Sequence, residues 1–222
     1  MKQSKCVIVV AGGKGLRMGS DIPKQFLELC GKPVLMHTLE RFYQYSPDIK
    51  IVLVLPAEQM DFWGKLCKKH RFNITHTIVQ GGSERFYSVK NGLKQVDTEF
   101  VAVHDGVRPL VSMETMERCF SEVEKHSAVV PVIDLVDSIR FVENTDISRP
   151  ANRADYKLVQ TPQVFRTDIL KKSYELPFSN RFTDDASVVE SAGNHVTLVK
   201  GNRENIKITT EVDLKIAEIF LK

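Results

Sequence analysis

The sequence predicts an α/β fold in which a mostly parallel, mixed sheet is flanked by helices. Short runs of β-branched and aliphatic residues, at 7–10, 51–55 and 100–104, are typical of strands buried on both faces of a parallel sheet. Helix-like segments separate these runs, and strand–helix–strand repetition at this spacing favours right-handed βαβ units. A chain of 222 residues is long enough for one large domain of this kind.

Composition narrows the class of protein. The chain is 42% hydrophobic and 27% charged, as is ordinary for a globular protein. Its net charge of +3 is too small and too evenly spread to indicate a nucleic-acid groove, and no apolar stretch reaches the ~18–20 residues of a membrane span. The first strand begins too early for a signal peptide, and the four cysteines show no metal-ligand spacing. We therefore expect a cytoplasmic protein with reduced thiols.

The first strand leads into a glycine-rich turn. Residues 7–24 read VIVVAGGKGLRMGSDIPK, in which Arg17 and Lys24 follow the glycines. Ligands of open α/β sheets bind at the carboxyl ends of strands, where glycines let the backbone approach closely. Because the cations indicate an anionic ligand, we expect a triphosphate-binding loop. The segment lacks the P-loop pattern, and the dinucleotide fingerprint fails at Met18. A plain strand-to-helix turn is the alternative.

Helices and strands are predicted to alternate through residue 132. The further helices are expected at about 33–45, 57–70, 85–96 and 113–126, and the further strands at 74–79 and 128–132. Pro33 suits the first position of its helix. The second glycine turn, QGGSER at 80–85, has Ser83 as the expected N-cap, and the N–H groups of such a helix start can receive an anion or a polar base edge.

Between Asp134 and about Val159 the pattern changes. Residues 138–142 alternate like an exposed hairpin strand, and residues 149–153 are interpreted as a turn. A structureless loop of this length would be unusual in a compact domain. We interpret residues 134–158 as a projecting β-arm, which usually needs a partner surface and so favours a dimer contact. An ordinary surface hairpin is the alternative.

The last part of the chain returns to alternating helices and strands. Residues 158–165 are expected to be extended or turning around Thr161–Pro162. Helices are expected at about 166–175 and 184–192, with a strand at 195–199. A final helix is capped by Thr209 or Thr210, and Asp213 favours Thr210. No internal repeat is visible, and we treat residues 1–222 as a single domain.

Charged residues follow the predicted strands. Asp105 and Arg108 come directly after the strand at 100–104, and Lys207 precedes the last helix. Because strand ends converge on one crevice, Asp105 is the best candidate ligand for Mg²⁺, which takes one or two carboxylates beside phosphate oxygens. A helix cap or an ion pair with Arg108 is the alternative. We expect His104 to be a buried structural histidine.

The sequence shows many cations and no evident nucleophile with a base, a pattern that suits transfer between phosphates. A phosphate oxygen is already ionised at neutral pH, so it can attack without a base. Catalysis then consists of overcoming anion repulsion, aligning the attack and stabilising charge on phosphorus. Asp184 and Asp185 could form an acid–base pair, but they are adjacent at a helix start, so capping and helix-dipole effects explain at least one of them.

Six ordered motifs together resemble the sugar-phosphate cytidylyltransferases, most of all the branch that acts on 2-C-methyl-D-erythritol 4-phosphate. They are AGGKGLRMGSDIPKQFLELCGKPVLMHTLERF, GGSERFYSV, VHDGVRPL, VQTPQVF, TDDASVVE and GNRENIKITTEVDL. The resemblance implies a Rossmann-like nucleotidyltransferase that uses CTP and Mg²⁺ and works as a homodimer through the β-arm. The implied reaction transfers CMP from CTP to the sugar phosphate and releases pyrophosphate, in the non-mevalonate isoprenoid pathway.

The resemblance also implies roles for individual residues. The catalytic residues would be Arg17, Lys24, Arg153 and Lys207. Nucleotide binding would involve Ala11, Gly12, Gly13, Gly15, Gly82, Ser88, Asp105 and Gly106. Substrate binding would involve Arg108, Ser138, Arg153, Thr161, Thr183 and Lys207. Asp105 would also hold the metal, and Arg153 on the arm would position the sugar phosphate, from the neighbouring subunit.

One departure from the family pattern leaves the sugar phosphate open. The common motif H-D-A-A-R-P has Gly106 and Val107 in this chain where the alanines stand. A related enzyme that acts on ribitol 5-phosphate has a similarly altered motif, so ribitol-5-phosphate cytidylyltransferase is the alternative. The double aspartate of TDDASVVE favours methylerythritol phosphate. A non-catalytic nucleotide-binding module is a third hypothesis.

Overall fold

The computed structural model of the chain describes residues 5–12 and 22–221. Gly13, Gly15 and Arg17, which are predicted for the site, lie outside these ranges. The described residues form one sheet of eight strands, two short two-stranded sheets and the helices that cover them. The α/β class predicted from the sequence is confirmed.

The centre of the large sheet consists of the three apolar runs predicted as buried strands. β1 (Lys5–Val10) lies between β4 (Lys50–Leu55) and β6 (Phe100–Asp105) and is parallel to both. β5 (Thr77–Gln80) continues the parallel sheet beyond β4. Residues 6–9 are fully buried, as expected for a strand that is covered on both faces.

The other half of the sheet is mixed. β11 (Gln163–Arg166) runs antiparallel between β6 and β7 (Ala128–Asp134). β7 also pairs with β10 (Lys157–Val159), antiparallel, and with β12 (Thr197–Lys200), parallel. The predicted mostly parallel, mixed sheet is therefore confirmed, with a strand at 163–166 where the pattern predicts only an extended or turning segment.

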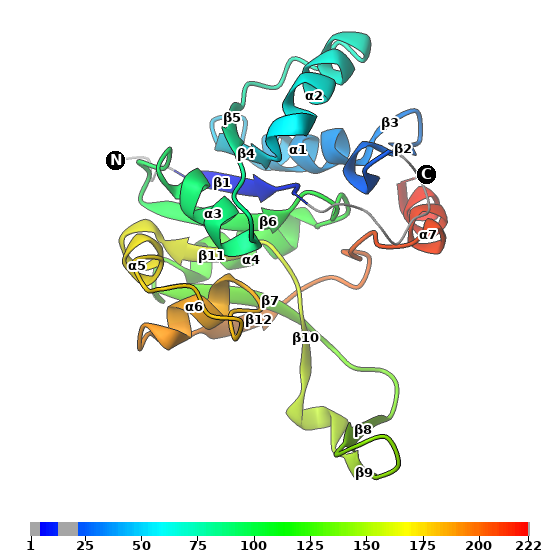
Figure 1. Cartoon of the computed structure of the whole chain (residues 1–222), viewed down its shortest axis with the longest axis vertical. Coiled ribbons are helices and arrows are strands. Elements are labelled where there is room, and N and C mark those ends of the chain that lie inside the picture. The colour runs from blue at the N-terminus through cyan, green and yellow to red at the C-terminus, as the bar shows by residue number, and fades with distance from the viewer. Residues whose placement is uncertain (1–4, 13–21, 222) are drawn as a thin grey trace.

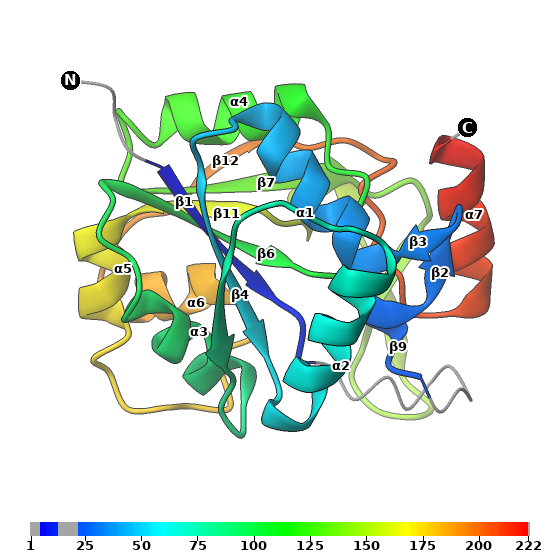
Figure 2. The same ribbon diagram turned by 90° about the horizontal axis from the view of Figure 1, so that it is seen from above.

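Helices cover both faces of the sheet (Figures 1 and 2). They are α1 (Val34–Tyr45), α2 (Ala57–Lys69), α3 (Arg85–Leu93), α4 (Met113–Glu122), α5 (Thr167–Ser173) and α6 (Asp185–Ser191). Val7 and Val9 pack into one core with α1, α2 and α4, whereas Cys6 and Ile8 pack into the other with α3, α5 and α6. Pro33 is the N-cap of α1 rather than its first residue.

The last helix, α7 (Glu211–Leu221), packs beside β2 (Glu28–Leu29). β2 forms a small antiparallel sheet with β3 (Lys32–Pro33). The helix packs on a small apolar cluster through Leu214, Ala217 and Leu221. No helix in the described part of the chain combines the length and the apolar character needed to cross a bilayer.

Two predicted helix caps differ in outcome. The cap at Thr210 is confirmed, because its Oγ1 accepts a hydrogen bond from the N–H of Asp213 at 3.3 Å, while the Asp213 carboxylate accepts from the N–H of Thr210 at 2.8 Å. The cap at Ser83 is wrong. Glu84 is the N-cap of α3, and its side chain makes no cap hydrogen bond. The turn is instead closed by Ser88, whose Oγ accepts from the N–H of Gly82.

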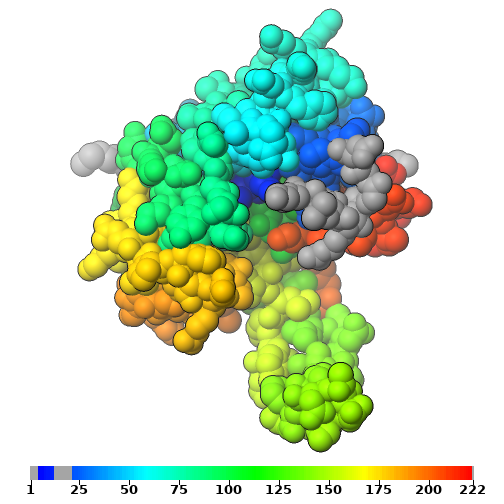
Figure 3. All heavy atoms as spheres, viewed as in Figure 1, coloured from blue at the N-terminus to red at the C-terminus, as the bar shows by residue number. Residues whose placement is uncertain are grey.

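A β-hairpin projects from the body of the molecule (Figures 1 and 3). β8 (Ile139–Val142) and β9 (Ser148–Ala151) form it in antiparallel register. The interpretation of residues 149–153 as a turn is wrong, because Pro150 lies within β9. The reversal lies earlier, where the Asn144 side chain accepts hydrogen bonds from the N–H groups of residues 146 and 147.

Candidate active site

A cavity of about 260 Å³ lies at the carboxyl ends of β1, β4 and β6. Its lining includes many of the residues predicted for the site: Ala11, Gly12, Lys24, Gly82, Ser88, Asp105 and Lys207. Val107 and Arg85 line it as well. The expected convergence of strand ends on one crevice is therefore confirmed.

The wall formed by the second glycine turn depends on close backbone packing. Ser88 is buried, and its Oγ accepts a hydrogen bond from the N–H of Gly82 at 3.1 Å. A Cβ atom at residue 82 would lie 2.4 Å from the Cβ of Tyr87, closer than real atoms approach. Only glycine therefore allows this turn to fold back onto the start of α3.

The opposite wall is held by a buried glutamine that sequence reasoning missed. Gln25 follows Lys24 in a short 3₁₀ helix, Lys24–Phe26. Its Nε2 donates to the carbonyl of Ala11 at 2.8 Å and to Oε1 of Gln59 in α2 at 2.7 Å. Gln25 thus ties the backbone next to Lys24 to the end of β1. The burial of Gln25 could not be predicted from hydrophobic periodicity, because polar residues are normally predicted to lie at the surface.

Asp105 is an ionised carboxylate among cations. Its Oδ2 lies 3.1 Å from Nε of Arg108 and 3.1 Å from Nζ of Lys207. Burial alone would raise the pKa of Asp105, but the charges of Lys207, Arg85 and Arg108 hold it well below the ordinary value of 3.8. The ion pair with Arg108, the alternative considered for this residue, is therefore present.

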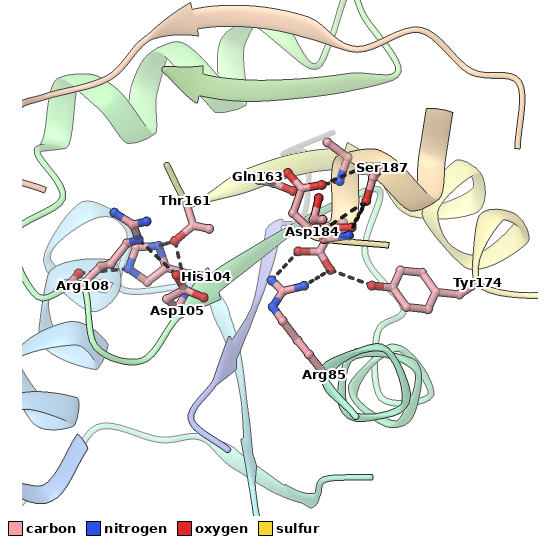
Figure 4. Close-up of polar contacts among 12 residues, drawn as sticks. Arg85, His104, Asp105, Arg108, Thr161, Gln163, Tyr174, Asp184 and Ser187 are labelled. Atoms are coloured by element: carbon pink, nitrogen blue, oxygen red, sulfur yellow. Dashed lines mark hydrogen bonds and ion pairs between the residues drawn. The ribbon is translucent and has the colours of Figure 1, made fainter. Parts of the chain in front are cut away.

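His104 lies behind Asp105 and is fully buried (Figure 4). The Asp105 N–H donates to Oγ1 of Thr161 at 3.1 Å, and this hydroxyl lies 3.1 Å from Nδ1 of His104. Nε2 of His104 is 3.0 Å from the carbonyl of Arg108. Burial lowers the pKa of His104 to about 4, so the ring is neutral. It accepts at Nδ1 and donates from Nε2, which confirms its predicted structural role.

Several predicted site residues lie outside the cavity lining. Thr161 is buried behind Asp105. A Cβ at Gly106 would lie 2.8 Å from the Cβ of Ala11, so this glycine serves close packing. Nη1 of Arg108 donates to the carbonyl of Asn205 at 2.8 Å, which holds the segment before Lys207. Thr183 is exposed just before α6.

The two arm residues predicted for the site do not reach the cavity of their own chain. Ser138 and Arg153 are exposed, and Arg153 donates to the carbonyl of Val136 at the base of the arm. Neither residue lines the cavity.

Sequence reasoning also missed an ion pair with a buried carboxylate at the cavity wall. Arg85 binds Asp185 through both carboxylate oxygens, at 3.0 and 2.6 Å, and Tyr174 donates its hydroxyl to the same carboxylate (Figure 4). Asp184 is the N-cap of α6 and accepts from the N–H of Ser187. The prediction that capping explains one of the two adjacent aspartates is confirmed.

The fold and the cavity together define the class of protein. Glycine turns bring backbone to a cavity at the carboxyl ends of parallel strands, and two lysines, Lys24 and Lys207, are among the residues that line it. This combination is typical of an α/β protein that binds a phosphorylated nucleotide.

The chain belongs to the IspD family, 2-C-methyl-D-erythritol 4-phosphate cytidylyltransferase, whose sequence profile matches residues 5–222. The proteins of that name from Bacteroides thetaiotaomicron and Bacteroides fragilis are each 56% identical to it. The first match covers 100% of both chains, and the second covers 98% of this chain and 99% of the relative. The chain is therefore a nucleotidyltransferase, and the resemblance stated from its motifs is confirmed.

Solved structures agree with this assignment. A 4-diphosphocytidyl-2C-methyl-D-erythritol synthase from Anaerococcus prevotii has a TM-score of 0.83 and 29% identity, covering 99% of this chain and 96% of its own. The cytidylyltransferase from Thermus thermophilus has a TM-score of 0.79 and 29% identity, with 99% and 98% coverage. The predicted Rossmann-like fold is confirmed by these neighbours.

Proposed function

We propose that this chain transfers CMP from CTP to 2-C-methyl-D-erythritol 4-phosphate, giving 4-diphosphocytidyl-2-C-methyl-D-erythritol and pyrophosphate for isoprenoid precursor synthesis. One observation carries the proposal. In a chain that matches the family over residues 5–222, Lys24, Lys207 and the ionised Asp105 line a single cavity whose walls also include Gly82 and Ser88.

The proposed reaction needs no general base. An oxygen of the sugar phosphate, ionised at neutral pH, forms a bond to the α-phosphorus of CTP, while the bond from that phosphorus to the bridging oxygen breaks and pyrophosphate leaves. The protein must offset the repulsion between two anions. At ~4 Å and an effective dielectric of ~20, one cation offers roughly 4 kcal/mol against a unit negative charge before desolvation. Lys24 and Lys207 supply such charges, together with Arg17.

The second glycine turn is proposed to bind the nucleotide. Because Oγ of Ser88 accepts the Gly82 N–H, its own hydroxyl hydrogen can be donated to a base or ribose oxygen. Ala11 is expected to donate a backbone hydrogen bond to the nucleotide, but its N–H is not available for this. Its N–H already donates to the carbonyl of Val54 at 3.0 Å. Its carbonyl also already accepts from Nε2 of Gln25, so Gly12 is the backbone donor proposed for this wall.

Mg²⁺ is the proposed cofactor, with Asp105 as its protein ligand. Both cations that contact this carboxylate do so at Oδ2, so Oδ1 is the oxygen proposed to bind the metal. The described residues contain no cluster of three or more His, Cys, Asp or Glu side chains that could hold a metal by themselves. This donor set fits Mg²⁺, which commonly binds one carboxylate together with substrate phosphates and water. When bound, it would neutralise phosphate charge.

The arm is proposed to form a homodimer and to bring Arg153 to the partner's cavity. An isolated two-stranded hairpin is marginal in water. This one exposes apolar side chains along its length: Val136, Phe141, Val142 and Ile147, with exposed fractions between 47% and 65%. A second copy of the chain would cover them. The same contact would explain why two predicted substrate-binding residues, Ser138 and Arg153, lie outside the cavity of their own chain.

The test is pyrophosphate release from CTP and Mg²⁺ with either 2-C-methyl-D-erythritol 4-phosphate or ribitol 5-phosphate. We expect turnover with the first substrate and little with the second, and loss of turnover when EDTA removes the metal. A preference for ribitol 5-phosphate would replace the proposed acceptor. Binding of CTP without turnover of either substrate would support the non-catalytic module instead.

A further inference from the structure

An ion pair between the partly exposed Arg85 and the buried Asp185 joins the starts of two helices at the cavity wall. Arg85 is the first residue of α3, and Asp185, one hundred positions later, is the first residue of α6. Nη1 donates to Oδ1 at 3.0 Å and Nη2 to Oδ2 at 2.6 Å. Tyr174 donates to Oδ1 at 2.6 Å. Asp185 is completely buried, and both of its carboxylate oxygens accept hydrogen bonds.

The Asp185 end of the pair is anchored in the sheet. Gln163 of β11 is fully buried, donates to Oδ2 of Asp184 at 2.7 Å and accepts at Oε1 from the N–H of Ala186 at 2.9 Å. Asp184 in turn caps the helix by accepting from the N–H of Ser187 at 2.9 Å. The first turn of α6 is therefore held on the central sheet.

Arg85, at the other end of the ion pair, lies within residues 82–88, the part of the cavity wall proposed to bind the nucleotide. Gly82 and Ser88 flank Arg85 in sequence, and their hydrogen bond folds residues 82–88 into one unit. The start of α3 has no side-chain cap to fix it. Phe86, next to Arg85, stacks on the ring of Tyr174 with centroids 4.7 Å apart. Residues 85 and 86 are thus held by the same neighbouring group.

Stability alone gives little reason for an ion pair here. A buried ion pair can often be replaced by apolar side chains without loss of stability, whereas two parallel N–H···O bonds fix both distance and angle. Burial and the charge of Asp185 raise the pKa of Tyr174 well above the ordinary value of 10.0, so its hydroxyl remains a donor. The distinctive property of this group is its geometry.

We propose that Asp185 and Tyr174 are positioning residues that act through Arg85 to hold residues 82–88 where they recognise the nucleotide. The inference rests on the proposed function, in which Gly82 and Ser88 contact CTP. Its consequence is selective. Loss of the pair weakens CTP binding, while kcat at saturating substrates and the KM for the sugar phosphate stay near those of the wild type.

The test compares Asp185→Asn and Tyr174→Phe with the wild type by steady-state kinetics and by calorimetric titration with CTP. Asp185→Asn puts an amide donor against the guanidinium, and we expect it to raise Kd and KM for CTP about tenfold or more, with kcat changed less than about threefold. Tyr174→Phe keeps the ring and should raise them about two- to threefold. Asp97→Asn, which removes an exposed ion pair with Lys50, is the matched control and should change none of these constants.

A double variant separates positioning from folding. Arg85→Met combined with Asp185→Leu replaces the ion pair by apolar packing, so we expect Tm to approach the wild-type value while Kd for CTP stays raised. If Tm and Kd recover together, the pair serves stability only and the inference is wrong. It is also wrong if Asp185→Asn leaves Kd unchanged, or if it weakens both substrates equally. A wild-type protein that binds CTP without turnover would contradict the proposed function, while the comparison of Kd values would still hold.

Discussion

Mild acid is expected to destabilise the fold through His104. The imidazole is completely buried, and burial lowers its pKa from 6.5 to about 4 in the folded chain. The unfolded chain therefore takes up this proton near pH 6.5, whereas the folded chain resists it until about pH 4. Stability conferred by the neutral ring is complete above pH 6.5 and is lost as the pH falls through this window. The difference in pKa corresponds to about 3 kcal/mol.

Urea unfolding of the wild type and of His104→Gln, measured between pH 7 and pH 4.5, would test this magnitude. We expect the wild type to lose a large part of the 3 kcal/mol over this range, and the variant to be less stable at pH 7 but to lose much less on acidification. His126→Gln is the control, because its ring is 45% exposed, and it should keep the wild-type slope. His37 leaves a residual slope in every variant, since burial lowers its pKa as well.

The test depends on the slope of the free energy of unfolding against pH and not on the absolute stability of the variant. A wild-type free energy of unfolding that stays flat between pH 6.5 and 4.5 would refute the argument. So would a His104→Gln protein with the wild-type slope, because the proton would then be taken up elsewhere. A confirmed slope that is lost in His104→Gln would show that the ring contacted by Thr161 is neutral in the folded chain.

Three further predictions concern the cavity and the arm. Lys207→Gln should lower kcat by about two to three orders of magnitude. It should lower Tm less than Asp105→Asn does, because Arg108 still pairs with the Asp105 carboxylate; a kcat near the wild-type value would refute its catalytic role. Asp105→Asn should lower the free energy of unfolding at pH 7 by about 3 kcal/mol, since it leaves the largely buried Arg108 guanidinium without a carboxylate partner. The pKa of Asp105 is lower in the folded chain than in the unfolded chain. The difference in stability between the wild type and Asp105→Asn should therefore shrink as the pH falls below 3.8, as measured by urea unfolding. Mixed Arg153→Ala and Lys24→Ala subunits should regain one active site per heterodimer in the pyrophosphate assay, and no recovery would mean that each site is built from one chain.

The central sheet could be predicted because strands buried on both faces need apolar residues at every position. β1, β4 and β6 therefore stand out as continuous runs, and the carboxyl end of β6 places Asp105 correctly. β11 does not stand out in the same way. It is short, begins with a fully buried glutamine and pairs with distant strands. Nothing local distinguishes it from an extended connection.

The arm shows the limit of turn chemistry as a signal. Proline and asparagine in RPANR favour a turn on composition, yet Pro150 pairs with Arg140 inside the hairpin. A proline is tolerated there because a strand of an isolated hairpin has one edge without a partner strand. The reversal uses Asn144, whose side chain replaces a backbone acceptor.

The groups behind the cavity were the least predictable part of the site. Residues that face the cavity follow strand ends or glycine turns, which are local patterns. Gln25 and Asp185 instead act on backbone or side chains far away in sequence, and each is a polar residue that burial statistics place at the surface. No period or spacing links Arg85 to a partner one hundred positions later. Such contacts emerge only once the fold has brought the helices together.

The structure distinguishes the two residues by which this chain departs from the family motif. Of the two altered positions after Asp105, Gly106 is directed at Ala11 and Leu35, where a Cβ would meet side-chain atoms at 2.8 and 3.1 Å. Its exchange therefore concerns packing behind the wall. Val107 lines the cavity itself. Val107 is therefore the altered residue that can contact a substrate directly, and Val107→Ala, which restores the common residue there, tests whether this contact selects the acceptor.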